Sequence, residues 1–485
     1  MGIVTSQSFK NTITTYLGFG IGAINTLFLY TAFITDEYYG LVAFVLSSAN
    51  IMMPLMAFGV HNTLIKFYST FKTKNALNSF LTLMLFLPIL IAIPIGIVGY
   101  ISYETISELL SQKNSIVKDY VWFIFIAAIA MAYFEVFFAW AKVQLQTAFG
   151  NFMKEVFHRI GVMLLLFCVH LEYINVDQFI LGIIGIYVLR MLIMKIYAFS
   201  IRFPVLKFKK IDNLSAVLKY SSLIIIAGSI ATLILDIDKF MLGQYLEIKE
   251  VAYYSVAIFI ATVIAVPQRA MHQILSPLTA QYLNSKNSTD LKDLYRRSSL
   301  NLFIISGLVF LLIVLNINQL YLIIPEEFNG GIYVVFLISF AKLYDNMLGN
   351  NNAILFNSDY YRMVLLFGIV LTVLTIILNM IFIPLYGING SALATFIAIF
   401  IYNTIKLIFV NQKFNIQPFL FQTLIVGVIL TLLVCVFYFW EFAFHPILNI
   451  VLKSFVVALS YTLVIYKLNL SEDISIAIKK YLRLR

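Results

Sequence analysis

The chain has 485 residues, of which 61% are hydrophobic and only 12% charged, and its formal net charge is +10. Soluble domains average about 25% charged residues, so this composition excludes a soluble globular protein. The two cysteines lie in separate apolar runs and are too few for a disulfide framework or a metal cluster, so we expect neither a cofactor nor a metal site.

Apolar runs of about 20 residues recur along the whole chain, and each is long enough to cross a ~30 Å hydrocarbon core as a helix. The runs lack the alternation of polar and apolar residues that a transmembrane barrel would show. Because no short apolar core with a cleavage pattern opens the chain, we expect the first run to remain as a helix. Fourteen spans are predicted, at 12–34, 40–61, 79–102, 119–141, 157–172, 178–200, 215–236, 251–275, 299–324, 332–356, 362–383, 388–411, 418–440 and 446–467.

The loops between these spans alternate in charge. One set holds most of the lysines and arginines, among them Lys72, Lys142, Lys154, Arg159 and Lys406, whereas the other set is acidic. Basic loops stay on the cytoplasmic side, so both termini are predicted to be cytoplasmic. The positive net charge then reflects topology and attraction to anionic headgroups, and no nucleic-acid partner is expected.

An internal repeat is predicted because the first and seventh spans start on the same side of the membrane. EYYGLVAF (37–44) aligns without gaps on AYYSVAIF (252–259), although tyrosine pairs are also common at membrane interfaces. We therefore predict an all-α polytopic membrane protein of about 14 transmembrane helices, with two six-helix bundles in parallel repeat plus two C-terminal helices. The expected segments are 1–212 and 213–413 for the bundles, and 414–485 for the two additional helices and a cytoplasmic tail.

Two further stretches carry a family resemblance. LDIDKFMLGQYLEIKEVAYYSVAIF (235–259) and LNMIFIPLYGINGSALAT (378–395) join predicted spans seven to eight and eleven to twelve. With EYYGLVAF, they make the chain resemble the polysaccharide-export flippases of the multidrug/oligosaccharidyl-lipid/polysaccharide superfamily. Their residues are architectural: a proline that ends a helix, glycines that permit a turn and small residues that permit close packing.

The resemblance implies a function. Members of the family move lipid-linked oligosaccharides, usually on a polyprenyl pyrophosphate, across the bacterial plasma (inner) membrane by alternating access. The cargo is a repeat unit of O-antigen (lipopolysaccharide), capsule or exopolysaccharide. Membrane lipids are expected partners, as are the polysaccharide polymerase and glycosyltransferases of the same pathway.

Ionisable residues inside a span are functional candidates, because burying a charge in the membrane costs about 2.5–3.5 kcal/mol or more. Arg269 and His272 lie three residues apart, as two donors for one anion, although Arg269 could instead reach lipid phosphates at the cytoplasmic side. Lys342 completes the predicted substrate-binding set, and Asp345 and Glu135 are the predicted ion-coupling groups. These residues could instead form ion pairs with a structural role, Lys342 with Asp345 and Glu135 with Arg190. For Lys453, a lipid tail groove or a headgroup contact is equally plausible.

Four residues are predicted hinges: Gly18, Gly20 and Gly22, which lie within five residues of the first span, and Pro267. Small residues equally allow tight helix packing at those glycines. At the outer end of span seven, Asp236, Asp238 and Lys239 are expected to form a solvated rim.

Three other functions compete with the lipid-linked flippase. A cation-coupled drug or small-molecule antiporter of the same superfamily should have a more acidic cavity, and a peptidoglycan-precursor flippase should carry arginines in its first two spans. A membrane-embedded polysaccharide polymerase or glycosyltransferase would need a catalytic acidic motif or a large external loop. None of these features is found in the sequence, so we expect a transporter and not an enzyme.

Overall fold

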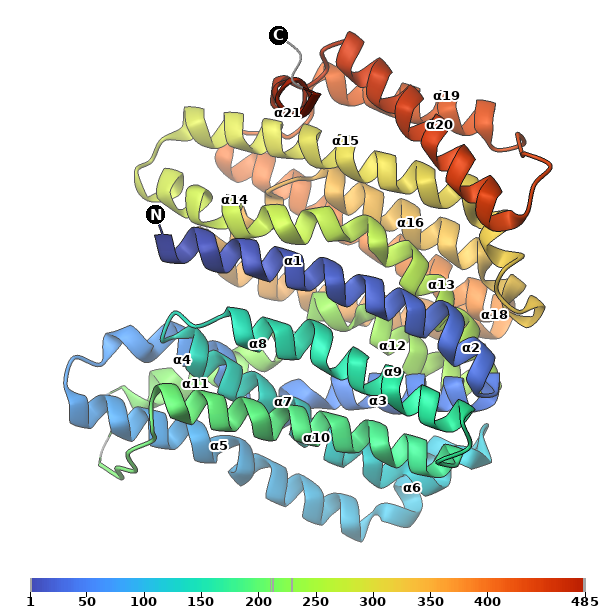
Figure 1. Ribbon diagram of the computed structural model, residues 1–485. Helices are drawn as coiled ribbons and strands as arrows, with labels where there is room; N and C mark the ends of the chain where they lie inside the picture. The colour runs from blue at the N-terminus through green and yellow to red at the C-terminus, as the bar shows by residue number, and fades with distance from the viewer. Residues whose placement is uncertain (1, 210, 212, 228–229, 483–485) are drawn as a thin grey trace. The chain divides into compact units, whose positions relative to one another are not determined.

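The computed structural model describes residues 2–209, 211, 213–227 and 230–482, and Figure 1 shows their arrangement. Within these residues every regular element is a helix, as the sequence predicted. Nine of the described helices are long and apolar enough to cross a membrane, or ten if Glu326–Met347 and Asn351–Asn357, bent by 56°, form one span. The chain is therefore an all-α polytopic membrane protein.

The predicted count of fourteen spans stays a prediction. One helix, α18 (Tyr361–Phe414), covers two predicted spans, and Gly387 interrupts it with φ 60° and ψ −137°. Two further apolar helices, Leu214–Ile225 and Phe421–Phe437, are shorter than a full span. The turn predicted at the glycines of 378–395 is confirmed as a kink at Gly387. The prediction that the proline of this stretch, Pro384, ends the helix is wrong, because the helix continues through it to Gly387.

The chain forms two compact units, whose boundary lies inside a helix. Unit 1 is Met1–Ser255 with Asn379–Ile388, and unit 2 is Val256–Leu378 with Asn389–Arg485. The predicted segments 1–212, 213–413 and 414–485 rest on a repeat that packing contacts do not test, and they stay a prediction.

In unit 1, α7 is the central helix and packs against α3, α4, α5 and α10. Its buried Phe134 and Trp140 lie in one core with Phe80 of α5 and Met194 of α10. The helices of this unit are α1 (Gly2–Ile24), α2 (Tyr30–Phe33), α3 (Asp36–Ala57), α4 (Val60–Phe67), α5 (Lys74–Ile101), α6 (Tyr103–Ser111), α7 (Val121–Lys142), α8 (Ala148–Phe152), α9 (His158–His170), α10 (Val176–Ile201), α11 (Leu214–Ala227), α12 (Ile230–Tyr245) and the first part of α13 (Ile248–Thr262).

In unit 2, α15 packs against α14, α16, α19 and α20. The Tyr461 hydroxyl of α20 donates a 3.0 Å hydrogen bond to the Ile304 carbonyl of α15 inside this core. The helices of this unit, besides α18, are α14 (Val266–Asn284), α15 (Ser288–Tyr321), α16 (Ile332–Met347), α17 (Asn351–Asn357), α19 (Phe421–Phe437), α20 (Pro446–Lys467) and α21 (Glu472–Leu482).

The C-terminal helix α21 is attached to α15 by one carboxylate. Asp473 accepts hydrogen bonds from the Arg297 Nε at 3.1 Å and from the Asn301 amide at 2.7 Å. The hydrogen bonds from Arg297 hold the pKa of Asp473 below its usual range. The carboxylate therefore stays charged, and the attachment is kept, at neutral pH.

Candidate functional site

The first candidate site lies in unit 1 and begins with an ion pair. The Lys154 ammonium lies 2.6 Å from the Glu135 carboxylate, and 14% of the Glu135 side chain is exposed against 43% for Lys154. Glu135 is seven residues, or about 10 Å of helix, inside the end of α7 at Lys142. Such a position within an apolar helix is costly for a lone carboxylate, and the lysine offsets that cost.

Arg159 of α9 lies against α1. Its guanidinium is 3.7 Å from the Glu155 carboxylate and 5.3 Å from the centre of the Phe19 ring. The Asn25 amide donates a 2.8 Å hydrogen bond to the Arg159 carbonyl, at the π-helical segment Asn25–Leu29 that follows α1. These contacts hold a second cation beside helices that the sequence predicts to be membrane spans.

Arg190 of α10 is buried, with 7% of the residue exposed. Its guanidinium stacks on Phe134 at 4.2 Å and on Tyr187 at 4.7 Å, and its Nε has no hydrogen-bond partner among the described residues. The alternative prediction that Glu135 forms an ion pair with Arg190 is wrong, because the Glu135 carboxylate pairs with Lys154 instead. The aromatic faces stabilise the charge of Arg190 without neutralising it.

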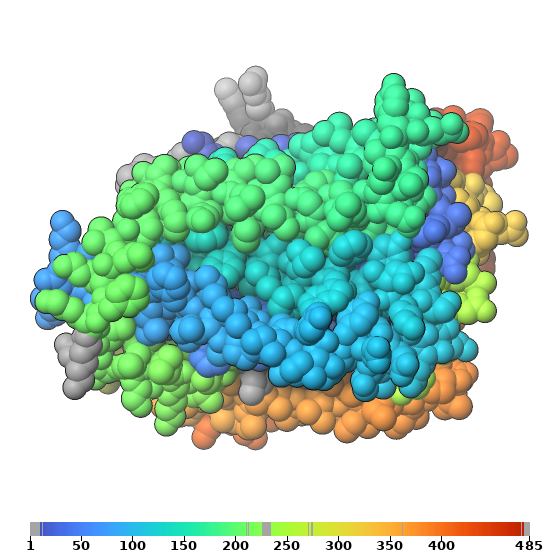
Figure 2. Space-filling model, turned by 90° about the horizontal axis from the view of Figure 1, so that it is seen from below, coloured from blue at the N-terminus to red at the C-terminus, as the bar shows by residue number. Residues whose placement is uncertain are grey.

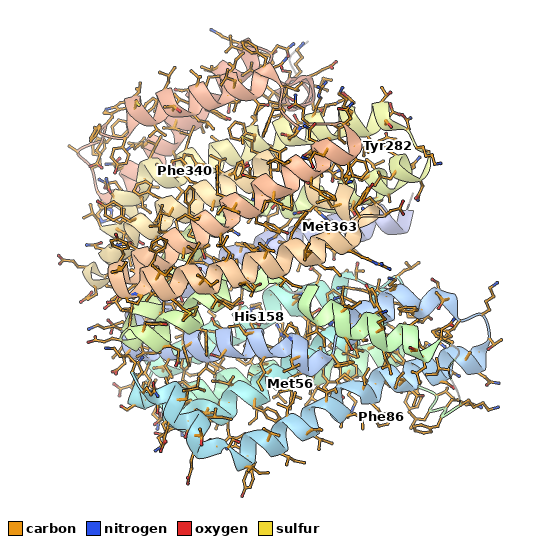
Figure 3. The ribbon with its side chains drawn as sticks, turned by 180° about the vertical axis from the view of Figure 1, so that it is seen from behind. Met56, Phe86, His158, Tyr282, Phe340 and Met363 are labelled. Carbon is orange, nitrogen blue, oxygen red and sulfur yellow. The ribbon has the colours of Figure 1, made fainter. Side chains whose placement is uncertain are left out.

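Together these residues form the unit 1 cationic cluster, which we define by four basic side chains and two carboxylates: Lys142, Lys154, Arg159, Arg190, Glu135 and Glu155. Glu135 also interacts electrostatically with Lys142, whose ammonium lies 3.9 Å from the centre of the Phe138 ring. His158, labelled in Figure 3, belongs to α9 beside the cluster. The sequence analysis assigned Lys142, Lys154 and Arg159 to a loop between two spans. For Lys154 and Arg159 the loop is wrong, because a helical stretch runs from α8 through α9 and contains both residues.

The second candidate site lies in unit 2, on α14 and α16. Arg269 and His272 lie one turn apart in α14, as their spacing predicts, and the structure shows both residues exposed. The Gln268 amide, next in the chain to Arg269, donates a 3.3 Å hydrogen bond to the Asp345 carboxylate of α16. This hydrogen bond shows that α14 and α16 meet at Gln268 and Asp345. The pairing of Lys342 with Asp345 stays a prediction, and so do their roles.

Pro267 follows a short 3-10 segment, Val263–Ala265, that interrupts the helix between α13 and α14. Proline cannot donate to a carbonyl one turn earlier, so a nearby carbonyl needs another donor. The buried Asn346 amide of α16 supplies one, with a 2.7 Å hydrogen bond to the Ile264 carbonyl. The break is therefore built into the packing of unit 2, and its use as a hinge stays a prediction.

Sequence reasoning missed Lys406, which it assigned to a cytoplasmic loop. Lys406 lies within α18 with none of its surface exposed. Its ammonium donates a 2.8 Å hydrogen bond to the Asn352 side chain, lies 4.1 Å from the centre of the Tyr402 ring and interacts electrostatically with Asp345. A lysine on an apolar helix face was the only sequence signal available for it.

Asp238 is also misplaced by the sequence, because the expected solvated rim is wrong at this residue. Asp238 is fully buried in unit 1. Its carboxylate accepts a 2.6 Å hydrogen bond from the Tyr254 hydroxyl and a 2.7 Å hydrogen bond from the Asn379 amide. One buried carboxylate thus ties together α12, α13 and the part of α18 that belongs to unit 1.

Asp238→Ala is expected to destabilise the protein by about 2–6 kcal/mol, because two buried donors lose this acceptor at about 1–3 kcal/mol each. Asp238→Asn is expected to cost less, since its carbonyl can still accept from Tyr254. The midpoint of thermal unfolding in detergent measures both variants. Equal midpoints for Asp238→Ala and the unsubstituted protein would contradict the structural role of this carboxylate.

The predicted glycine hinge lies within a continuous helix, α1. A side chain at Gly18 would come within 2.5 Å of the Glu155 carbonyl, whereas one at Gly20 would meet nothing within 4 Å. Gly18 therefore permits close packing of α1 on the cationic cluster. Hinge motion at Gly18, Gly20 and Gly22 stays a prediction.

Lys453 of α20 is buried, and its ammonium has no hydrogen-bond partner among the residues that the structure describes.

Comparison with protein families decides the affiliation of the chain. A family model described as "Polysaccharide biosynthesis protein" matches residues 5–283, more than half of the chain. The chain belongs to the polysaccharide biosynthesis protein family. This confirms the resemblance found in the sequence. A search of curated proteins gave no match.

Solved structures show which fold this polysaccharide biosynthesis family member has. It is similar to the lipid II flippase MurJ in an inward closed conformation, with a TM-score of 0.72 at 14% identity over 95% of this chain and 99% of that chain. An inward-facing multidrug resistance MATE family transporter of the MOP superfamily gives a TM-score of 0.56 at 12% identity, over 86% of this chain and 95% of that chain. A MOP superfamily transporter from Pyrococcus furiosus, described with a reverse-polarity binding pocket, gives 0.54 at 11% identity, over 85% and 96%. At these identities the likeness establishes the fold alone.

Proposed function

We propose that the protein is a flippase that moves a polyprenyl-pyrophosphate-linked oligosaccharide across the bacterial plasma membrane by alternating access. The cargo would be a repeat unit of O-antigen, capsule or exopolysaccharide. The unit 1 cationic cluster is the observation that carries this proposal: it places four basic side chains and only two carboxylates among apolar helices. An excess of positive charge suits an anionic pyrophosphate, which cannot cross hydrocarbon unaided.

The second site complements the first in this proposal. Arg269, His272 and Lys342 would bind the cargo, and Asp345 and Glu135 would couple transport to an ion. Both termini would be cytoplasmic, and the polymerase and glycosyltransferases of the pathway would supply and consume the cargo. Tags on the two termini test this orientation, because accessibility from opposite sides of the membrane would contradict the even number of spans.

Transport of labelled lipid-linked oligosaccharide between the leaflets of liposomes tests the function. We expect purified protein to make the label accessible from the opposite leaflet without changing its covalent structure. New glycosidic bonds would instead identify a polymerase or glycosyltransferase. Uptake of an organic cation without movement of the lipid would favour the antiporter, the alternative supported by the likeness to MATE transporters.

Arg269→Ala is expected to lower transport about tenfold or more, since a hydrogen bond to a charged group contributes ~1.5–3 kcal/mol. Arg269→Lys should retain more transport than alanine, because it keeps the charge but loses bidentate binding. The measurement is the transport rate in liposomes at equal protein content. Equal rates for all three proteins would show that Arg269 is only an interfacial anchor.

A further inference from the structure

Unit 1 has a second basic feature, which is lined by other residues than those of the cationic cluster. A cavity of about 550 Å³ lies at the N-terminal end of α5 and the C-terminal end of α10, and its lining includes Lys72, Lys74, Asn78, Gln144 and Arg202. An adjoining cavity of about 320 Å³ shares Lys72 with it. On the face shown in Figure 2, the green residues that follow α10 lie beside the blue residues at the start of α5.

Arg202 is held in place within this cavity. One of its terminal nitrogens donates a 2.6 Å hydrogen bond to the Tyr68 hydroxyl, and the other donates a 3.2 Å hydrogen bond to the Asn78 side chain. The Gln144 amide donates to the same hydroxyl at 2.6 Å, and the Trp140 indole donates to the Arg202 carbonyl at 3.1 Å. The guanidinium is therefore positioned before any ligand arrives, which lowers the entropy lost on binding.

The described residues that line the cavity carry positive charge only. Among them, no acidic side chain lines either cavity, and none of Lys72, Lys74 and Arg202 takes part in an ion pair with another described residue. Lys74 is moreover the first residue of α5, where the positive end of the helix dipole disfavours a cation. Like charges repel one another, and a bound anion would relieve that repulsion.

The rim of the cavity is apolar and aromatic. The segment 203–208, which we name the strap, follows α10 without helical structure, and Phe203 and Phe208 are 76% and 80% exposed. The backbone N–H of Lys207 donates a 3.0 Å hydrogen bond to the Thr82 hydroxyl, which fixes the strap on α5. The ring centre of Phe208 lies 6.2 Å from the ring centre of Phe86, an exposed residue of α5 that is labelled in Figure 3. Exposed aromatic rings beside lysines are typical of the membrane–water interface.

We propose that this cavity binds the phosphate of an anionic phospholipid. Lys72, Lys74 and Arg202 receive the phosphate, while the acyl chains lie over the strap and the exposed apolar face of α5. A lipid fits this site better than a soluble phosphate because the apolar rim continues directly from the basic cavity. The bound lipid links the start of α5 to the connection between α10 and α11.

Native mass spectrometry and thermal unfolding of the purified full chain test the proposal. The probes are phosphatidylglycerol, phosphatidylcholine with the same acyl chains, and inorganic phosphate. We expect phosphatidylglycerol to bind and to raise the unfolding midpoint, and the Lys72→Gln/Lys74→Gln variant to bind it about tenfold more weakly. A control with the same loss of charge is Lys286→Gln/Lys467→Gln, whose exposed lysines lie outside both cavities and away from the strap in sequence, and which should bind as the unsubstituted protein does.

Without added lipid, the Lys72→Gln/Lys74→Gln variant should unfold at the same temperature as the unsubstituted protein or higher, because the removed charges form no ion pair with a described carboxylate. This separates a ligand site from a merely structural pair of lysines, whose loss would lower the midpoint. Equal weakening by both double variants would overturn the proposal in favour of diffuse attraction to membranes. Stabilisation by inorganic phosphate but not by phosphatidylglycerol would overturn the lipid as its ligand.

Discussion

Gly40→Ala is expected to lower the thermal stability and the membrane abundance of the protein severely. A side-chain carbon at Gly40 of α3 would lie 1.9 Å from the Ile248 carbonyl oxygen, at the start of α13. The clash is with backbone rather than with a flexible side chain, so α3 and α13 would have to separate. Overpacking typically costs about 1–3 kcal/mol, and we expect at least the upper end of that range here.

Gly99→Ala is the matched control. It makes the same substitution inside the apolar helix α5, where the added carbon would meet nothing within 4 Å. Because alanine favours helix over glycine, this variant should be as stable as the unsubstituted protein or slightly more stable. Thermal unfolding of both variants in one detergent measures the difference. If Gly40→Ala melted together with the control, the close contact between α3 and α13 would be wrong.

The same contact explains why two of the sequence motifs occur together. EYYG ends at Gly40, and the turn between α12 and α13 lies in the second motif. The Asn114 amide donates to the Gly243 and Leu246 carbonyls at 2.7 and 2.9 Å, and its carbonyl accepts from the Ile248 N–H at 2.8 Å. Small residues and a buried cap thus let three segments meet. These parts of the motifs serve the architecture of the fold, as their residue types indicate.

Sequence reasoning predicted what depends on local properties. The length and apolar character of the runs predicted the helical membrane fold, and Gly387 marked a real break because glycine readily adopts its positive φ. The placement of Arg269 and His272 one turn apart on a helix also followed from the local sequence.

Partners contributed by distant segments could not be predicted in this way. Lys154, Lys406 and Asp238 were assigned to loops or a rim because charged residues usually lie in water. The structure pairs them with Glu135, Asn352 and Tyr254 respectively. Hydropathy averages over a window, so it cannot distinguish a charge facing water from one buried against a partner on another helix.

Exchanging the charges of Glu135 and Lys154 separates the structural role of their ion pair from a role in transport. Glu135→Lys alone places two ammonium groups at the position of the present 2.6 Å contact, and we expect a large loss of protein abundance. The double variant Glu135→Lys/Lys154→Glu re-forms an ion pair of opposite direction, and abundance should recover.

Transport by the double variant is expected to stay below about a tenth of the original rate, because the proposed coupling needs a carboxylate on α7 itself. A tenfold loss of rate corresponds to a barrier higher by ~1.4 kcal/mol. In the unsubstituted protein the Glu135 carboxylate faces Lys142 as well as Lys154. The exchange would place a cation there instead and enlarge the repulsion within the cluster. The transport rate in liposomes, normalised to protein content, measures this effect. Full recovery of transport together with abundance would reduce the pair to a structural link between α7 and the segment before α9, and Glu135 would lose its proposed role.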